Sequence, residues 1–356
     1  MIISRTPFRI SFFGGGTDYP AWYRKHGGAV VGTTINKYCY ITCRYLPPFF
    51  EHRYRVVYSK SEEVLDIDEI AHPAVREVLR YLNIERGVEI HHDGDLPARS
   101  GLGSSSAFTV GLLNALSALK GQMASKAQLA RDSIYIEQER LKETVGSQDQ
   151  VLAAYGGLNH VTFLPNNEIS VVPMTLTQER LNELSAHLML FFTGIVRTAS
   201  DIAQTYVQED FETQDKIRAI GQMVDDAVSI LNSGEDIARF GKLLHECWRN
   251  KRELSGKVSN SFVEEIYQQA MSAGAVGGKL IGAGGGGFML LFVRPADQKK
   301  VRERLSGLIH VPFQFSYSGS QVIFFDPEED YSRQEQDRMF RQITRFQESE
   351  SVNLQP

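Results

Sequence analysis

The sequence lacks the features that define several classes of protein. It has only three cysteines among 356 residues, Cys39, Cys43 and Cys247, too few and too scattered to indicate a disulfide framework or a zinc site. It has no apolar run of the roughly 18 residues that a membrane-spanning helix needs, and no apolar leader follows Met1. We therefore expect a cytoplasmic protein without a membrane partner.

Positive charge is also scarce. The 38 lysines and arginines are outnumbered by 43 aspartates and glutamates, which gives a net charge of −5. Domains that bind nucleic acid are usually basic, so we expect no nucleic-acid partner. The hydrophobic content of 42% and charged content of 23% are ordinary for a globular chain. The length allows two lobes.

Two common nucleotide-binding patterns are missing. The chain contains no G-x-x-x-x-G-K-[ST] pattern, which excludes that type of nucleotide loop. The first predicted strand, residues 2–13, is not followed by G-x-G-x-x-G, which weakens a dinucleotide-binding fold.

Glycine and serine are instead concentrated in residues 97–107, Pro-Ala-Arg-Ser-Gly-Leu-Gly-Ser-Ser-Ser-Ala. A predicted strand at 87–92 precedes this stretch, and the helical spacing of 107–119 follows it. The start of a helix presents unpaired N–H groups and partial positive charge. Glycines let the backbone approach a ligand, and serine hydroxyls can cap the helix, bind phosphate or coordinate a metal. We interpret the stretch as a phosphate-binding loop; the alternative is a serine-capped helix after a flexible turn.

The remaining elements mix strands and helices without a strict β-α repeat. Ser125 and Gln128 form a capping-box pattern that predicts the start of a long helix carrying Glu137. A loop with Asp149 then leads into a short helix at 150–155.

The second half is different in character. A buried strand is predicted at 188–194, and amphipathic helices are predicted from 199 to 273. A β-α-β-β ending is predicted over 288–325.

Three glycine stretches, taken in order, resemble the motifs of the GHMP kinases (galactokinase, homoserine, mevalonate and phosphomevalonate kinases) over residues 1–325. They are Thr6-Pro-Phe-Arg9 to Asp18, the stretch 97–107, and Lys279-Leu-Ile-Gly-Ala-Gly-Gly-Gly-Gly287. Within that superfamily, Arg9-Ile-Ser-Phe-Phe-Gly-Gly-Gly-Thr-Asp18 looks like the D-glycero-D-manno-heptose 7-phosphate kinases. Galactokinases carry an acidic residue and a histidine before Thr-Asp, and this chain carries two glycines there.

The resemblance implies an α+β, two-lobed GHMP kinase fold. A ribosomal S5 domain 2-like N-terminal lobe would occupy residues 1–180 and an α/β C-terminal lobe residues 181–326. A charged tail would follow at 327–356. The nucleotide would lie between the lobes.

The resemblance also implies roles for individual residues. Asp149 would accept the proton of the sugar hydroxyl, and Arg9 would hold Asp149 ionised. Ser105 and Glu137 would hold Mg²⁺. The ATP phosphates would lie on Ser100, Gly101, Leu102, Gly103, Ser104, Ser105 and Ser106. The substrate would contact Gly15, Gly16, Thr17, Asp18, Arg197, Gly285 and Gly286.

The implied function is ATP- and Mg²⁺-dependent phosphorylation of the anomeric hydroxyl of D-glycero-D-manno-heptose 7-phosphate to the 1,7-bisphosphate, for nucleotide-heptose synthesis. The partners are then a nucleotide and a small sugar phosphate. Arg99 and Arg197 are candidates for holding the 7-phosphate. Two alternatives stay open: a kinase for a free sugar of the fucose or galactose type, and a sugar-sensing relative without turnover. Oligomeric state also stays open, with a homodimer as one option.

Overall fold

The computed structural model describes residues 1–195, 211–327, 331, 333, 334 and 337. The predicted substrate residue Arg197 lies outside this part of the chain, as does most of the predicted tail. Every helix within the described residues is too short or too polar to cross a membrane.

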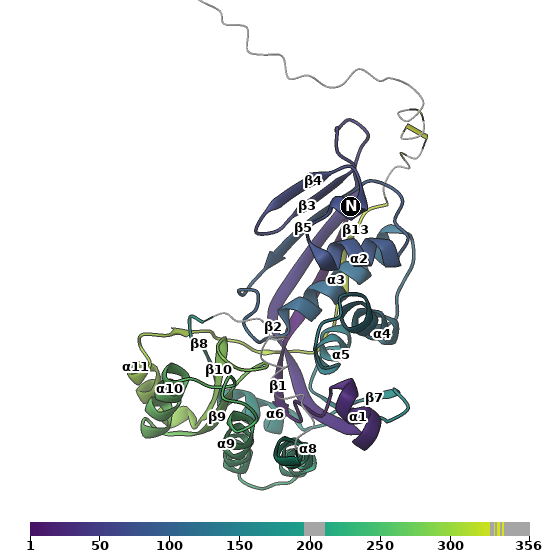
Figure 1. Cartoon of the computed structure of the whole chain (residues 1–356). Coiled ribbons are helices and arrows are strands. Elements are labelled where there is room, and N and C mark those ends of the chain that lie inside the picture. The colour runs from purple at the N-terminus through teal and green to yellow at the C-terminus, as the bar shows by residue number, and fades with distance from the viewer. Residues whose placement is uncertain (196–210, 328–330, 332, 335–336, 338–356) are drawn as a thin grey trace, which may run out of the picture.

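Two long antiparallel strands form the frame of the molecule, β1 (Ile2–Phe13) and β2 (Gly28–Tyr45). They run through most of its length in Figure 1. Along the first residues of β1, buried and half-buried positions alternate, and from Thr6 to Phe13 every residue is buried. A strand buried on both faces needs such a continuous run of enclosed side chains.

Strand β2 is the branch point of the first sheet. Its residues 28–32 pair with β6 (Asn159–Phe163), and residues 39–45 pair with β5 (Val88–Gly94). Residues 28–45 thus form one continuous strand of 18 residues. The strand continues because different partners satisfy its backbone groups along its two halves.

The described part of this sheet has nine strands. The others are β3 (Tyr54–Val57), β4 (Ser61–Val64), β7 (Ile169–Pro173), β12 (Phe315–Ser316) and β13 (Gln321–Phe325). Only the β3–β5 pair in the described pairings is parallel.

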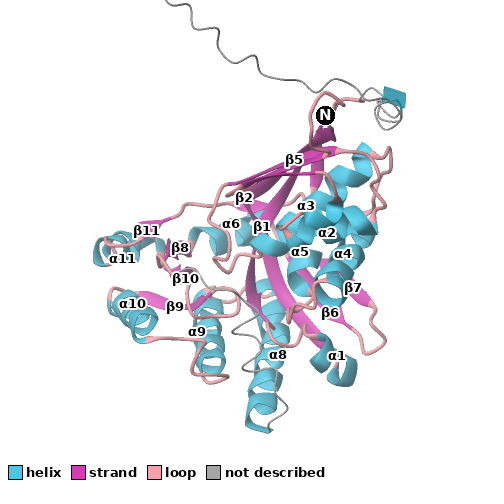
Figure 2. Cartoon of the chain, turned by 45° about the horizontal axis from the view of Figure 1, so that its top comes forward, coloured by secondary structure: helices cyan, strands magenta, loops and turns pink. Residues whose placement is uncertain are grey.

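Helices cover one face of this sheet (Figures 1 and 2). They are α2 (Pro73–Tyr81), α3 (Ser104–Leu119), α4 (Lys126–Tyr135) and α5 (Gln148–Tyr155). Helix α3 is the central one and is buried from Ser106 to Ser117. Ser125 caps α4 by accepting a hydrogen bond from the Gln128 N–H, as expected. The helix then widens into a π-helical turn, η2 (Ile136–Arg140).

The second lobe contains a four-stranded antiparallel sheet in the order β11-β8-β10-β9. Its strands are β8 (Leu188–Phe192), β9 (Ala275–Leu280), β10 (Phe288–Val293) and β11 (Ile309–His310). The remaining α-helices are α1 (Pro20–His26), α6 (Gln178–Ala186), α8 (Phe211–Asn232), α9 (Ala238–Arg252), α10 (Ser261–Ser272) and α11 (Gln298–Arg304). Short 3₁₀ turns span Ile67–Glu69 and Pro295–Asp297.

One hydrophobic core joins the two lobes. The rings of Phe12 and Phe13 at the end of β1 meet the ring of Phe240 on α9 edge-on, with centroids 5.4 and 5.1 Å apart. Lys279 on β9 donates a hydrogen bond to the Phe12 carbonyl across the same junction, at 2.8 Å. The last residues of β1 are therefore held in place by contacts with both lobes.

The end of the described chain returns to the first sheet, which corrects the predicted lobe boundary. We expected residues up to 326 to complete the second lobe. Instead, β12 pairs with β2, and β13 pairs with β1 from Ile2–Phe325 to Arg5–Gln321. The outer edge of β1 carries N–H and C=O groups that need partners, and β13 supplies them.

This return can be tested at two glycines that meet in the structure. A Cβ on Gly156, whose φ is +70°, would lie 2.2 Å from the Gly319 nitrogen, and one on Gly319 would lie 2.0 Å from the Ala154 carbonyl oxygen. We expect Gly156→Ala and Gly319→Ala each to lower the free energy of unfolding by about 2 kcal/mol or more. Gly307→Ala is the control, because a Cβ there meets no described atom within 4 Å. Denaturant unfolding that ranks all three variants alike would contradict this packing.

Candidate functional site

An ion pair between β1 and α5 forms the centre of the candidate site. Arg9 Nε donates to Asp149 Oδ1 at 2.7 Å, and Arg9 Nη2 donates to Oδ2 at 2.5 Å. Arg9 is 5% exposed, whereas the Asp149 side chain is 24% exposed. The two parallel hydrogen bonds fix the carboxylate plane. The structure thus brings together the two residues that the sequence predicts as catalytic, with Asp149 open to a ligand.

The predicted phosphate loop lies against this pair. Arg9 Nη1 donates to the Gly101 carbonyl at 2.5 Å, and the Arg9 N–H donates to the Leu102 carbonyl at 3.0 Å. Gly103 adopts a left-handed conformation, with φ +74°, directly before α3. A side chain on Gly103 would crowd both Arg9 and Asp149. The loop therefore brings the N-terminus of α3 next to the ion pair.

The serines of the loop face in different directions. Ser100 is buried and donates to the Pro97 carbonyl at 2.6 Å, while the Ser104 hydroxyl accepts a hydrogen bond from the Arg99 N–H at 3.1 Å. Ser105 is exposed and Ser106 is buried. Successive helix residues point about 100° apart, and of these two it is Ser106 whose side chain faces inward.

The glycine-rich segment of the second lobe packs backbone to backbone against the phosphate loop. A Cβ on Gly101 would lie 2.4 Å from the Ile281 carbonyl oxygen, and one on Gly287 would lie 2.1 Å from that of Ser100. The predicted substrate residues Gly285 and Gly286 contact their own lobe. Gly285 donates to the Val258 carbonyl at 2.8 Å, and Gly286 packs against Ile195. A substrate contact at either glycine stays a prediction.

Glu137 lies behind the phosphate loop, and its hydroxyl partner is the serine after the one expected to share a metal with it. Its Oε2 accepts hydrogen bonds from Ser106 Oγ at 2.9 Å and from Gln150 Nε2 at 2.6 Å. We expected Ser105 to share a metal with Glu137, but the hydroxyl that meets this carboxylate belongs to Ser106. The helix phase points Ser106 inward and Ser105 to solvent. Metal binding by either serine stays a prediction.

The Glu137 carboxylate lacks a full set of partners. It is 1% exposed, and its Oε1 has no hydrogen-bond partner among the described residues. Burial and then the nearby charge of Glu143 raise the pKa of Glu137 to about 8. A buried carboxylate in this state favours either a proton or a cation.

A magnesium ion fits this arrangement. Within the described residues, no group of three or more His, Cys, Asp or Glu side chains could hold a metal alone. Mg²⁺ commonly takes one or two carboxylates, together with water and substrate phosphates. Glu137, with Ser106 beside it and its own Oε1 free of protein partners, could supply the carboxylate; such a metal would neutralise phosphate charge.

Thr17 and Asp18, predicted to bind sugar, make hydrogen bonds within the protein, and sugar binding by either residue stays a prediction. The Thr17 hydroxyl donates to the Gly14 and Ala29 carbonyls at 2.8 and 2.9 Å. The Asp18 carboxylate is 1% exposed and accepts hydrogen bonds from the Gly16 and Gln148 N–H groups at 3.0 and 3.2 Å. Burial and then the charge of Asp149 raise the pKa of Asp18 to about 6. Asp18 therefore holds the loops at 14–18 and 146–149 together, and Thr17 joins the first of these loops to β2.

Sequence reasoning missed several buried polar residues around the site. Gln150 donates a hydrogen bond to Glu137. The one sequence feature that could have identified Gln150 is its position directly after Asp149. Lys251 on α9 donates to the carbonyls of Leu280 and Gly282. Burial lowers the pKa of both Lys251 and Lys279. Neither lysine forms an ion pair with a described carboxylate. A single lysine within a predicted helix or strand does not indicate that its amine is buried, so the sequence could not predict either one.

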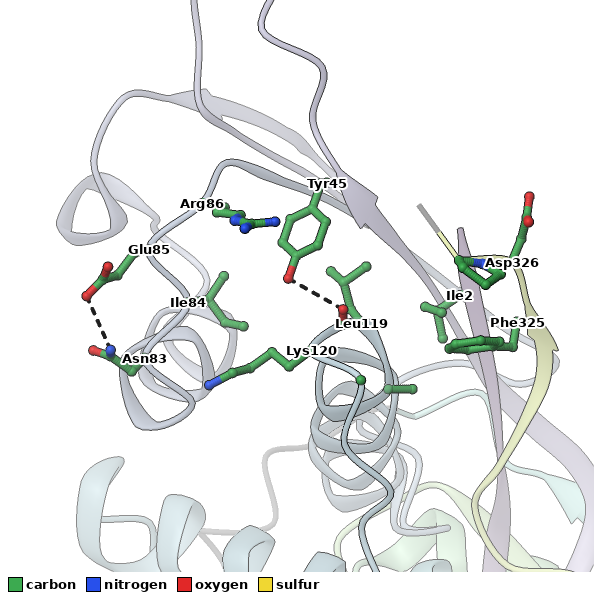
Figure 3. Close-up of a pocket in the computed structure, with 13 residues that line it drawn as sticks. Ile2, Tyr45, Asn83, Ile84, Glu85, Arg86, Leu119, Lys120, Phe325 and Asp326 are labelled. Carbon is green, nitrogen blue, oxygen red and sulfur yellow. Dashed lines mark hydrogen bonds between the residues drawn. The ribbon is translucent and has the colours of Figure 1, made fainter. Parts of the chain in front are cut away.

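A separate cavity of about 530 Å³ lies at the far end of the first sheet. Figure 3 shows Tyr45, Arg86, Lys120 and Phe325 around it. Its cations already have contacts: Arg86 lies over the Tyr45 ring at 5.0 Å, and Lys120 donates to the Leu82 carbonyl at 2.5 Å. The residues lining it include none of the predicted site residues. We therefore place the functional site at the ion pair.

Two family models match the chain. The GHMP kinases N terminal domain matches residues 69–157, and the GHMP kinases C terminal model matches residues 226–309. The first range lies in the first lobe and includes the phosphate loop, η2 and α5. The second lies in the second lobe and includes α9 and the glycine-rich segment.

Individual relatives agree with these matches. The D-glycero-α-D-manno-heptose 7-phosphate kinase of Campylobacter jejuni is 30% identical over 313 residues, covering 83% of this chain and 91% of that protein. The bifunctional fucokinase/GDP-fucose pyrophosphorylase of Arabidopsis thaliana is 27% identical over 327 residues, 84% of this chain and 30% of that protein. The crystal structure of a D-glycero-D-manno-heptose 1-phosphate kinase from Bacteroides thetaiotaomicron is 26% identical, with a TM-score of 0.75, and covers 92% of this chain and 100% of that one. The expected two-lobed fold is confirmed.

The buried carboxylate gives a pH-dependent prediction. The ordinary pKa of Glu137 is 4.5 and its folded value is about 8, so ionising it costs the folded state stability as pH rises through this window. We expect Glu137→Gln to be more stable than the wild type by about 2 kcal/mol or more at pH 8.5 without magnesium, and nearly equal to it at pH 5.

Glu139→Gln on the same π-helical turn is the matched control, because its side chain is 54% exposed. Thermal or denaturant unfolding at both pH values checks the prediction. A pH-independent effect of Glu137→Gln would mean that Glu137 carries no burial penalty.

Proposed function

The chain belongs to the GHMP kinase family and is a sugar kinase, and from this membership we propose its reaction. It transfers the γ-phosphoryl group of ATP to the anomeric hydroxyl of D-glycero-D-manno-heptose 7-phosphate. The products are the 1,7-bisphosphate and ADP. The observation that carries this proposal is the Arg9–Asp149 ion pair beside the phosphate loop.

The ion pair suits phosphoryl transfer. This reaction needs positioned reactants and charge neutralisation more than covalent chemistry. Arg9 uses one lone-pair direction on each oxygen of Asp149, so the carboxylate keeps capacity to accept another hydrogen bond. The sugar oxygen attacks the γ-phosphorus, its proton passes to Asp149, and the bond from phosphorus to the leaving ADP oxygen breaks. The two hydrogen bonds from Arg9 hold the Asp149 carboxylate in position for this step.

The nucleotide phosphates would lie at the N-terminus of α3. The Gly103 conformation leaves the first N–H groups of this helix without a side-chain cap in the described structure. N–H groups at a helix start favour phosphate. When bound, Mg²⁺ at Glu137 would neutralise charge on those phosphates and help to align them. The exposed Ser105 hydroxyl could bind a phosphate oxygen directly.

The heptose assignment is supported by relatives that bear heptose names. One is named a heptose 7-phosphate kinase and the other a heptose 1-phosphate kinase. Carbons 1 and 7 are the two positions that carry phosphate in the proposed product. Arg99 is one candidate for holding the existing phosphate. It is exposed within the phosphate loop, and its charge partly offsets the burial that raises the pKa of Glu143.

A free-sugar kinase of the fucose type is the second candidate. Two relatives have fucokinase in their names, at 27% and 25% identity. A non-catalytic sugar sensor is less consistent with this structure, because a sensor needs neither Arg9 nor Asp149 in reaction geometry. In this chain the two side chains are joined by parallel hydrogen bonds, which supports a kinase.

The role of Asp149 can be tested by replacing it with the isosteric amide. We expect Asp149→Asn to bind ATP but to lose kcat by roughly 10²–10⁴-fold, the usual contribution of a positioned general base. Steady-state kinetics and ATP calorimetry measure the two effects separately. Asp215→Asn on α8, with 78% of its side chain exposed, controls for loss of a surface charge. Near-normal turnover by Asp149→Asn would remove this residue from the mechanism.

The substrate can be identified by comparing kcat/KM for heptose 7-phosphate, free heptose, mannose and fucose. We expect heptose 7-phosphate to lead by at least about 100-fold, because charge-assisted hydrogen bonds to a substrate phosphate discriminate strongly against the free sugar. ³¹P NMR should place the new phosphate on the anomeric carbon. A preference for fucose would select the second candidate instead.

A further inference from the structure

Two polar side chains beside the ion pair have unused hydrogen-bonding groups. Ser11 Oγ and Gln148 Oε1 are both buried and have no hydrogen-bond partner among the described residues. The residues are only 6% and 9% exposed. Buried polar atoms without partners cost free energy, and native structures contain few of them. Such atoms in a catalytic site indicate a polar ligand.

Each of the two side chains is close in sequence to one residue of the ion pair. Ser11 is two residues after Arg9 on β1, so their side chains lie on the same face of the strand. Gln148 directly precedes Asp149 and begins α5. The two side chains therefore come from the same strand and the same helix as the two residues of the ion pair.

Gly15 marks the space that these side chains share. A Cβ on Gly15 would lie 3.5 Å from Gln148 Nε2 and 4.0 Å from Ser11 Oγ, with no described atom closer. Both distances are ordinary contacts, and Gly15 has no left-handed φ. Gly14 is different, because its φ is +87° and its Cβ would lie 1.9 Å from the Ala29 carbonyl oxygen. The fold therefore requires glycine at 14 but leaves free volume at 15.

The neighbouring polar residues are already engaged in holding the loop. The Thr17 hydroxyl binds two carbonyls, and both Asp18 oxygens accept backbone N–H groups. We propose that Ser11 and Gln148 bind hydroxyl groups of the sugar in the space over Gly15. This inference rests on the proposed function and adds two specificity-determining residues to it.

The chemistry of the pair matches neighbouring hydroxyls. A serine hydroxyl and a glutamine amide can each donate and accept, as can each hydroxyl of a sugar. A phosphate group fits less well, because the buried carboxylate of Asp18 and the half-buried carboxylate of Asp149 lie close by. The pair is next to Asp149, so it would bind the hydroxyls on carbons adjacent to the reacting one. The existing phosphate of the substrate would then lie farther from Asp149.

The experiment removes each polar group while keeping its volume. We expect Ser11→Ala and Gln148→Met each to raise KM for heptose 7-phosphate roughly three- to tenfold, with KM for ATP changed less than twofold. Their melting temperatures without sugar should stay equal to or above that of the wild type, because each variant removes an unpaired buried group. Gly15→Ala should fold normally and raise the same KM more strongly, because its methyl group fills the sugar's space.

Two matched variants control for structural effects. Ser4→Ala removes a buried hydroxyl from the same strand that already donates to the Gly111 carbonyl at 2.8 Å. It should lower the melting temperature and leave the sugar KM unchanged. Gly14→Ala should destabilise the fold, unlike Gly15→Ala.

Sugar binding measured by calorimetry separates this proposal from the proposed function. If the wild type turns over fucose instead of heptose 7-phosphate, the heptose assignment fails, and the variants are judged on fucose. The hydroxyl-binding proposal is overturned if Ser11→Ala and Gln148→Met bind the preferred sugar as the wild type does, which would mean that the pair holds an ordered water only. It is also overturned if the wild type binds none of the sugars tested.

Discussion

The site depends on the bidentate ion pair between Arg9 and Asp149. Its two hydrogen bonds form only when β1, α5 and the phosphate loop keep fixed positions relative to one another. Arg9 contacts all three, since it lies on β1, pairs with Asp149 on α5 and donates to the Gly101 carbonyl. The junction of both lobes at the end of β1, through Phe12 and Lys279, fixes the strand that carries this arginine. Precision at the site therefore comes from the core below it.

Charge is distributed unevenly around this pair. Glu137 and Asp18 are buried carboxylates with raised pKa values, and Lys251 and Lys279 are buried amines with lowered ones. Each of these groups contacts backbone or neutral side chains in place of an opposite charge. Such an arrangement costs stability in the free protein. A bound nucleotide with its cation would bring compensating charges, so binding and stability should be coupled.

The sequence was most informative where chemistry requires particular residue types in close succession. Arg9, Asp149 and the glycines at 101 and 103 were predicted from such motifs, and they come together in the structure. The choice between Ser105 and Ser106 was not predictable, because it depends on the rotation of α3 about its axis. Ser11 and Gln148 escaped notice because their importance lies in missing partners, which only three-dimensional packing reveals. The predicted end of the second lobe at residue 326 was wrong, because the pairing of residue 2 with residue 325 leaves no local pattern in the sequence.

That pairing also orders events during synthesis of the chain. The first sheet contains the first strand and the last described strand, with the whole second lobe between them. Met1 and Asp326 are hydrogen-bonded at 2.9 Å. A ribosome would thus synthesise residues 1–325 before β1 obtained its full outer neighbour. Until then, this strand would carry an open edge, the kind of surface on which nascent chains associate wrongly. The first lobe is therefore completed only after the second has been synthesised, because its strands come from both sides of the second lobe in the sequence.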